Sequence, residues 1–123
     1  MPASYVIDQD HRVVFSRGWD GLTDADLARH QAALLRDPAF EPTFAQLWDL
    51  REISDTASVS VKGVRCLAGR EVFGPWARRA FVAPRPLSFK LARIFAVLRK
   101  QRGESGIEVF RDLASACDWI GLR

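Results

Sequence analysis

The segment of residues 78–98, RRAFVAPRPLSFKLARIFAVL, constrains the fold of this chain most strongly. It begins with a short β-rich apolar run, Ala80–Ala83, which two prolines close off. The stretch that follows has large apolar residues at the spacing of one helix face, namely Leu91, Ile94, Phe95 and Leu98. A strand that leads through a short loop into a helix is the unit from which parallel sheets are built. The segment therefore predicts an α/β fold.

The remainder of the chain repeats this alternation of strand and helix. Further strands are expected at Tyr5–Asp8, Val13–Ser16, Phe44–Leu50 and Ile107–Phe110. Helices are expected to begin at Thr23, at Ser58 or Ser60, at Pro86 or Ser88, and at Asp112. The first two strands suit an antiparallel hairpin, and the later alternation implies right-handed crossovers between parallel strands. We therefore expect a single α/β domain over residues 1–123, ordered ββαβαβαβα, with a mainly parallel five-stranded sheet, an antiparallel first strand and four helices.

Glycine and proline mark where these helices are expected to end. The second helix is expected to carry the apolar stripe Val61, Val64, Ala68 and Val72 and to stop at Gly74-Pro75. The third is expected to end at Gly103, with the basic residues Arg99, Lys100 and Arg102 in its last turn, where cations suit the helix dipole.

Composition narrows the class of protein. The chain has 123 residues, of which 48% are hydrophobic and 27% charged, as in globular proteins. No apolar run approaches the roughly 20 residues that span a bilayer, and the first residues lack a secretory signal, so we expect a cytoplasmic protein. The cysteines, Cys66 and Cys117, and the histidines, His11 and His30, show no metal-ligand spacing. We expect neither a metal nor a cofactor.

Charge is distributed unevenly along the chain. Residues 1–61 contain 5 Arg and 10 Asp or Glu, whereas residues 62–123 contain 13 Lys or Arg and 5 Asp or Glu. Such an asymmetry is typical either of a solvated basic face or of a surface that meets an anionic partner. The basic residues are spread over several expected elements, and only Trp and Phe offer stacking surfaces, so nucleic acid is the less favoured partner.

The order and punctuation of the chain resemble a known fold family. The resemblance rests on YVID…RVVFSRGWDGLTDADLARH, DPAFEPTFAQLWDLREI, RRAFVAPRPLSFKLARIF and VFRDLASACDWIG. These patterns are similar to the SpoIIAA-like fold, which includes STAS domains, and more closely to small bacterial domains of the STAS/SEC14 type. The resemblance implies no catalytic residues. SEC14-like relatives bind lipids in a cavity, which favours a ligand role by analogy.

Some STAS proteins are phosphorylated on a serine at a helix start. The matching segment here is Asp55-Thr56-Ala57-Ser58, which departs from the Asp-Ser-Ser-Gly form of that motif. Ser58 is therefore a weak candidate for a phospho-switch, and the alternative is that it caps a helix. No serine lies in Gly-x-Ser-x-Gly, and the chain has no phosphate-binding glycine loop, so we do not expect an enzyme.

Ligands of open α/β sheets bind beyond the carboxyl ends of the strands. Three expected loops meet at that edge, and basic side chains, an indole and a helix start would suit an anionic head group there. The candidate ligand-binding residues are Arg17, Trp19, Arg51, Arg85, Ser88 and Lys90. The alternative is that these arginines pair with neighbouring acids such as Asp20, Glu52 and Asp55.

A separate surface is expected just before the strand at Ala80. Trp76 follows a helix stop, and Arg78 and Arg79 come next, which is a composition typical of protein interfaces. The first hypothesis is therefore a non-enzymatic interaction module that contacts a protein partner or a second copy of itself through Trp76, Arg78, Arg79 and the basic third helix. The second is a domain that binds a lipid or another amphipathic anion at the carboxyl edge of the sheet.

Overall fold

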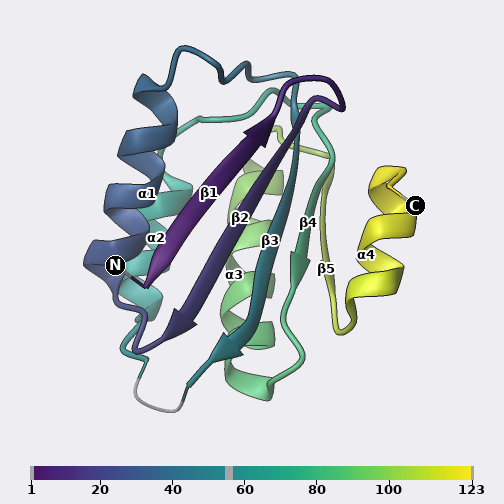
Figure 1. Cartoon of the computed structure of the whole chain (residues 1–123). Coiled ribbons are helices and arrows are strands. Elements are labelled where there is room, and N and C mark those ends of the chain that lie inside the picture. The colour runs from purple at the N-terminus through teal and green to yellow at the C-terminus, as the bar shows by residue number, and fades with distance from the viewer. Residues whose placement is uncertain (1, 55–56, 123) are drawn as a thin grey trace.

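The computed structural model describes residues 2–54 and 57–122. In these residues the elements are β1 (Ala3–Asp8), β2 (Val13–Asp20), α1 (Asp24–Arg36), β3 (Ala45–Ile53), α2 (Val61–Ala68), β4 (Arg79–Val82), α3 (Pro86–Gln101), β5 (Ile107–Phe110) and α4 (Leu113–Ile120). The strands form one sheet in the order β1-β2-β3-β4-β5, and only β1 runs antiparallel to its neighbour (Figure 1). The predicted α/β class, element order and mixed sheet are confirmed.

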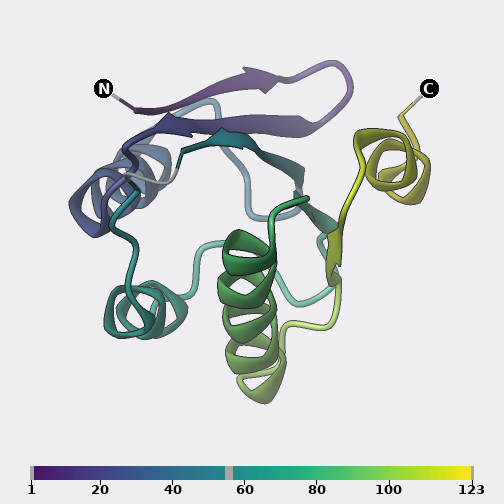
Figure 2. The same cartoon turned by 90° about the horizontal axis from the view of Figure 1, so that it is seen from below.

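The helices form unequal layers on the two faces of the sheet. Each parallel strand is added on the same side of the one before, so right-handed crossovers place α1, α2 and α3 together on one face. Helix α4 follows the last strand and lies on the other face (Figure 2). Trp48 and Phe81 project into the core beneath α2 and α3, whereas Leu47 and Ala80 pack on the α4 side.

Side-chain caps at Thr23, Ser60 and Asp112 fix three helix starts where the sequence predicts them. Thr23 Oγ1 accepts the Asp26 backbone N–H at 3.1 Å, and the Asp26 carboxylate accepts the Thr23 backbone N–H at 3.0 Å, which completes a capping box. Asp112 caps α4 by accepting the Ser115 backbone N–H at 2.8 Å. These interactions are local, which is why a short sequence pattern reveals them.

Helix α3 begins at Pro86, one of its two predicted starts. Pro86 occupies its first turn after the N-cap residue Arg85, where a residue without a backbone N–H costs no hydrogen bond. Ser88 therefore does not cap α3, and its hydroxyl instead donates to the Arg85 carbonyl at 3.2 Å.

Several predicted boundaries were wrong. Strands β2 and β3 continue to Asp20 and Ile53, because their outer residues pair with each other past the expected breaks. Helix α2 begins after Ser60, one of the two predicted caps, but it ends at Ala68, so Val72 is not on it. Val72 is buried all the same, in a cluster beyond the helix end.

Candidate ligand-binding cavity

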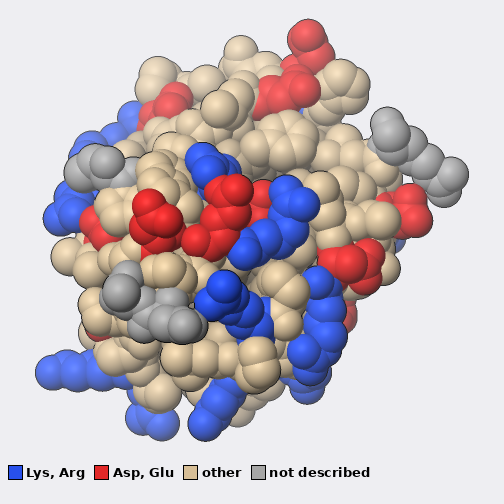
Figure 3. All heavy atoms as spheres, turned by 60° about the horizontal axis from the view of Figure 1, so that its bottom comes forward, with Lys and Arg blue, Asp and Glu red and all other residues tan. Residues whose placement is uncertain are grey.

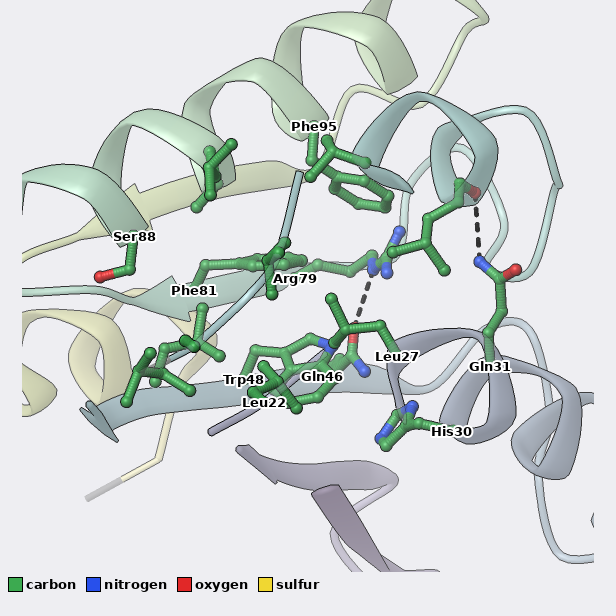
Figure 4. A pocket seen from close by; sticks show the side chains of 18 of the residues that line it. Leu22, Leu27, His30, Gln31, Gln46, Trp48, Arg79, Phe81, Ser88 and Phe95 are labelled. Atoms are coloured by element: carbon green, nitrogen blue, oxygen red, sulfur yellow. Dashed lines mark hydrogen bonds between the residues drawn. The ribbon is translucent and has the colours of Figure 1, made fainter. Parts of the chain in front are cut away.

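A cavity of about 540 Å³ lies between the sheet and the helices α1, α2 and α3. Its walls are mainly apolar, with Leu27 from α1, Trp48 from β3 and Phe95 from α3 among the lining side chains (Figure 4). Cavities that hold small molecules in proteins typically measure about 300–1,000 Å³ and combine apolar walls with a few polar groups. The cavity therefore has the size and lining of a binding site for a small apolar or amphipathic molecule.

The cavity has a solvent-facing end and a buried end. Its exposed lining residues are Arg85, Pro86 and Leu87, which lie at the start of α3 beyond the end of β4. Gln46 and Phe73, at the opposite end, are each 1% exposed. The mouth is thus at the carboxyl edge of the sheet, where the sequence predicts a ligand site, and acidic and basic side chains both appear on the surface there (Figure 3).

A chain of hydrogen bonds crosses the buried end. Arg79 Nε donates to Gln46 Oε1 at 3.0 Å, Gln46 Nε2 donates to Ser16 Oγ at 3.0 Å, and His30 Nε2 lies 2.9 Å from Ser16 Oγ. Gln46 and Arg79 are register partners on β3 and β4, so both side chains project from the same face of the sheet. The sheet therefore positions two polar side chains side by side inside an otherwise apolar space.

Two arginines in this region share one carboxylate. Arg79 Nη1 donates to Glu104 Oε1 at 3.1 Å and to Oε2 at 2.9 Å, while Arg99 Nε donates to Glu104 Oε1 at 2.9 Å. All three side chains are at most 6% exposed. Arg99 also donates to the Ala68 carbonyl at 2.9 Å, which ties α3 to the end of α2. The prediction that Arg99 serves as a cation in the last turn of α3 misses this buried pairing.

Burial shifts the pKa of two titratable groups, Arg79 and His30, that line the cavity away from its mouth. Desolvation lowers the pKa of the Arg79 guanidinium, and Glu104 opposes that effect, so the group stays protonated near neutral pH. Desolvation, helped by the positive charge of Arg79, lowers the pKa of His30 from 6.5 to about 4. His30 is therefore neutral at physiological pH, and its ring packs between Tyr5 and Trp48 with centroids 5.3 Å and 4.5 Å away.

Three of the predicted ligand-binding residues lie on the wrong face of the sheet to reach this cavity. Arg17 pairs with Glu52 and stacks 4.7 Å from the ring of Trp19, on the face opposite α1. Arg51 donates to both carboxylate oxygens of Asp49 at 2.9 Å, which lowers the pKa of Asp49. Arg17 and Arg51 thus form ion pairs with neighbouring acids, which was the predicted alternative, and do not converge with Arg85.

The structure places the other predicted residues at or near the mouth. Arg85 and Ser88 line the cavity, whereas Lys90 is an exposed residue of α3 outside the lining. Ser58 is exposed and lies two residues before Ser60, the residue that caps α2. Part of the motif considered with Ser58, Asp55-Thr56, lies outside the described residues.

The predicted interface trio separates into three environments. Trp76 is 82% exposed. Arg78 lies over the Trp119 ring at 5.2 Å and donates to the Trp119 carbonyl at 2.6 Å, on the α4 side. Arg79 is 5% exposed and points into the core, so its inclusion in a contact surface was wrong. The two arginines diverge because Arg79 is the first residue of β4 and takes the inward position of the pleat.

Gln46, Glu104 and the role of His30 were not predicted from the sequence. A signal for Gln46 was available, since it is a polar residue inside the apolar run Phe44–Leu50. Buried polar side chains require partners, so such a residue indicates a polar group on a neighbouring strand. Glu104 follows Gly103 in a loop, and no local pattern distinguishes it from an exposed acid.

Comparison with solved structures gives the fold a name. A matching structure is an uncharacterized protein from the DUF3478 family with a SpoIIAA-like fold from Shewanella loihica PV-4. The match covers 96% of this chain and 93% of that chain, with a TM-score of 0.57 and 17% sequence identity. The chain has a SpoIIAA-like fold. In this SpoIIAA-like protein the cavity lies between the sheet and the layer formed by α1, α2 and α3.

The chain matches no protein-family model and no curated protein, so the fold is what the comparisons establish. Among residues 2–54 and 57–122, no helix is long and apolar enough to cross a membrane. Nor does this part of the chain contain a group of three or more His, Cys, Asp or Glu that could hold a metal ion.

Proposed function

We propose that this SpoIIAA-like protein is a non-enzymatic cytoplasmic module that binds an amphipathic anionic molecule in the cavity between its sheet and its helices. The observation that carries the proposal is the apolar cavity of about 540 Å³, which opens beside Arg85 at the carboxyl edge. Protein cores normally pack as densely as organic crystals and leave few voids larger than a water molecule. A space of this size in a chain of 123 residues is expected to serve an occupant.

The walls favour an occupant with an apolar body. Leu27 from α1 and Phe95 from α3 line the cavity together with Trp48 from β3 (Figure 4), and Leu91, also on α3, adds to the apolar wall. Each apolar Å² that a ligand removes from water contributes about 25 cal/mol, so an aliphatic or aromatic body supplies affinity without specific hydrogen bonds. The polar groups at the two ends then set which way round an amphipathic molecule lies.

Binding of a neutral fluorescent probe tests the proposal. We expect 1-aminoanthracene, whose emission rises in apolar surroundings, to bind the purified protein in a saturable manner. Ala92→Phe extends a ring from α3 into the cavity, because Ala92 is buried and lines it, and should weaken binding at least about tenfold. Val97→Phe adds the same ring on the exposed side of α3, where Val97 is 47% exposed, and should leave binding unchanged.

Two results would contradict the proposal. One is the absence of saturable binding to the wild-type protein. The other is equal binding by the two phenylalanine variants, which would place the probe on the surface. Thermal unfolding of both variants checks that each is folded, because a larger side chain at a buried position can destabilise the core.

A second candidate function is contact with another copy of the chain through Trp76. An indole that is 82% exposed is favoured at interfaces, where Trp is enriched among the residues that dominate binding energy. Light scattering during size-exclusion chromatography should then show a dimer that Trp76→Ala dissociates. Val6→Ala, which removes another exposed apolar side chain (67% exposed, on β1), is the control. A monomer across the micromolar range would remove this candidate.

A further inference from the structure

We propose that the cavity takes an aliphatic monocarboxylate whose carboxylate lies at the buried end against Arg79, with the hydrocarbon chain directed to the mouth at Leu87. This inference rests on the proposed ligand-binding function and adds to it the class of ligand and its orientation. It differs from the site expected from sequence, which places the anion outside, at Arg85 and Ser88.

The buried end of the cavity contains more positive than negative charge. Arg79 and Arg99 contribute two positive charges, and Glu104 is the one carboxylate bonded to either guanidinium within the described residues. His30 is neutral, so the buried cluster has one positive charge in excess. An isolated charge away from water is costly, and a ligand with one negative charge would neutralise it.

One nitrogen of the Arg79 guanidinium is left to bind a ligand. Its Nε and Nη1 are bonded to Gln46 and Glu104, whereas Nη2 forms no hydrogen bond with the described residues. No buried side-chain nitrogen or oxygen in the described part of the chain lacks a partner. Nη2 has no such partner, so it is not fully buried. Because Arg79 lines the cavity, Nη2 borders that space. A guanidinium N–H that faces a cavity is a suitable donor for a carboxylate oxygen.

Aromatic rings hold the Arg79 guanidinium in place. Its Cζ lies 4.3 Å from the centroid of Phe73, 5.3 Å from that of Phe95 and 5.6 Å from that of Phe81. The close-up shows the guanidinium between Phe95 and Gln46, at the far end of the cavity from Ser88 (Figure 4). A cation fixed in this way and shielded from solvent interacts more strongly with an anion than an exposed one does.

The mouth suits the other end of the ligand. Leu87 is 65% exposed there, and Leu22, Leu50 and Ile53 form the adjoining wall at the ends of β2 and β3. A carboxylate beside the exposed Arg85 would remain in water and gain little, because surface ion pairs contribute about 0–1 kcal/mol. A hydrocarbon end there instead covers apolar surface.

Calorimetric titration with decanoate and decanol tests the inference on the wild-type protein. The two molecules share a chain and differ in charge, so we expect decanoate to bind at least about tenfold more tightly. Raising the salt concentration should change the decanoate affinity less than twofold, because buried pairs are screened little. Equal binding of the two, or a steep loss with salt, would overturn the inference and leave the ligand-binding function standing. Failure of both molecules and of the neutral probe to bind would overturn both.

Arg79→Met provides the matching variant. It removes the excess charge and leaves Glu104 paired with Arg99, so it should bind decanoate and decanol equally. Arg78→Met, which removes the neighbouring arginine on the α4 side, should keep the preference for decanoate. A preference retained in Arg79→Met would overturn the inference. If Arg79→Met does not fold, the comparison of decanoate with decanol binding to the wild-type protein still tests the inference.

Discussion

Glu104 is expected to be the most sensitive charged residue of the chain. It is 2% exposed, and it accepts hydrogen bonds from both Arg79 and Arg99, whose side chains are 6% and 5% exposed. Glu104→Gln keeps the size of the side chain but leaves two buried guanidinium groups without a counter-charge. Removal of one member of a buried ion pair costs about 3–5 kcal/mol, which is a large part of the roughly 5–15 kcal/mol that stabilises a domain.

Urea unfolding followed by tryptophan fluorescence measures this loss, because Trp48 is 6% exposed in the core. With a slope of about 2 kcal/mol per molar urea, a loss of about 4 kcal/mol lowers the midpoint by roughly 2 M. Glu108→Gln is the control. Glu108 pairs with Lys100 at 3.3 Å, with the two side chains 48% and 43% exposed, so its loss should cost no more than about 1 kcal/mol. A Glu104→Gln effect as small as that of Glu108→Gln would refute the account of the buried cluster.

Three further predictions concern stability. The pKa of His30 is about 4 in the folded protein and 6.5 ordinarily, so the neutral ring contributes fully to the free energy of unfolding above pH 6.5. Because the unfolded chain binds the proton first as the pH falls, the free energy of unfolding decreases by about 2 kcal/mol at pH 5. His30→Gln should remove this decrease when the free energy of unfolding is measured with urea at each pH. Gly63→Ala should destabilise the fold by about 1–2 kcal/mol in chemical denaturation, because the new Cβ would come within 2.2 Å of the Asp24 carboxyl group. The control is Gly69→Ala, whose Cβ meets ordinary contacts, so this variant should be neutral or stabilising. Thr23→Ala removes the cap of α1 and should cost about 1 kcal/mol by the same assay, and no change would show that the capping box is not needed.

The parts of the fold that are predictable from sequence depend on interactions between near neighbours. The capping box at Thr23 and the cap at Asp112 involve residues three apart, and a short pattern therefore reveals both. The end of α2 is less predictable. Val72 continues the apolar period of that helix, yet the helix ends at Ala68 and Val72 packs beyond it. A period in the sequence indicates burial, and it does not establish that the helix continues.

The candidate site is less predictable because it depends on the face from which each strand residue projects. Arg17 and Arg51 lie near the expected edge of the sheet, but the pleat directs them away from the three-helix layer. Arg78 and Arg79 are adjacent in sequence and enter different environments for the same reason. Loop positions alone suggest proximity, whereas strand register decides which side chains meet.

The central claim is that a carboxylate enters the cavity and reaches Arg79. The most direct measurement is a crystal structure of the protein with ω-bromodecanoate, in which anomalous scattering locates the bromine at the end of the chain. The account predicts bromine at the mouth near Leu87 and the carboxylate within hydrogen-bond distance of Arg79 Nη2. Bromine beside Phe73 with the carboxylate at Arg85, or no ligand between the sheet and the helices, would contradict it.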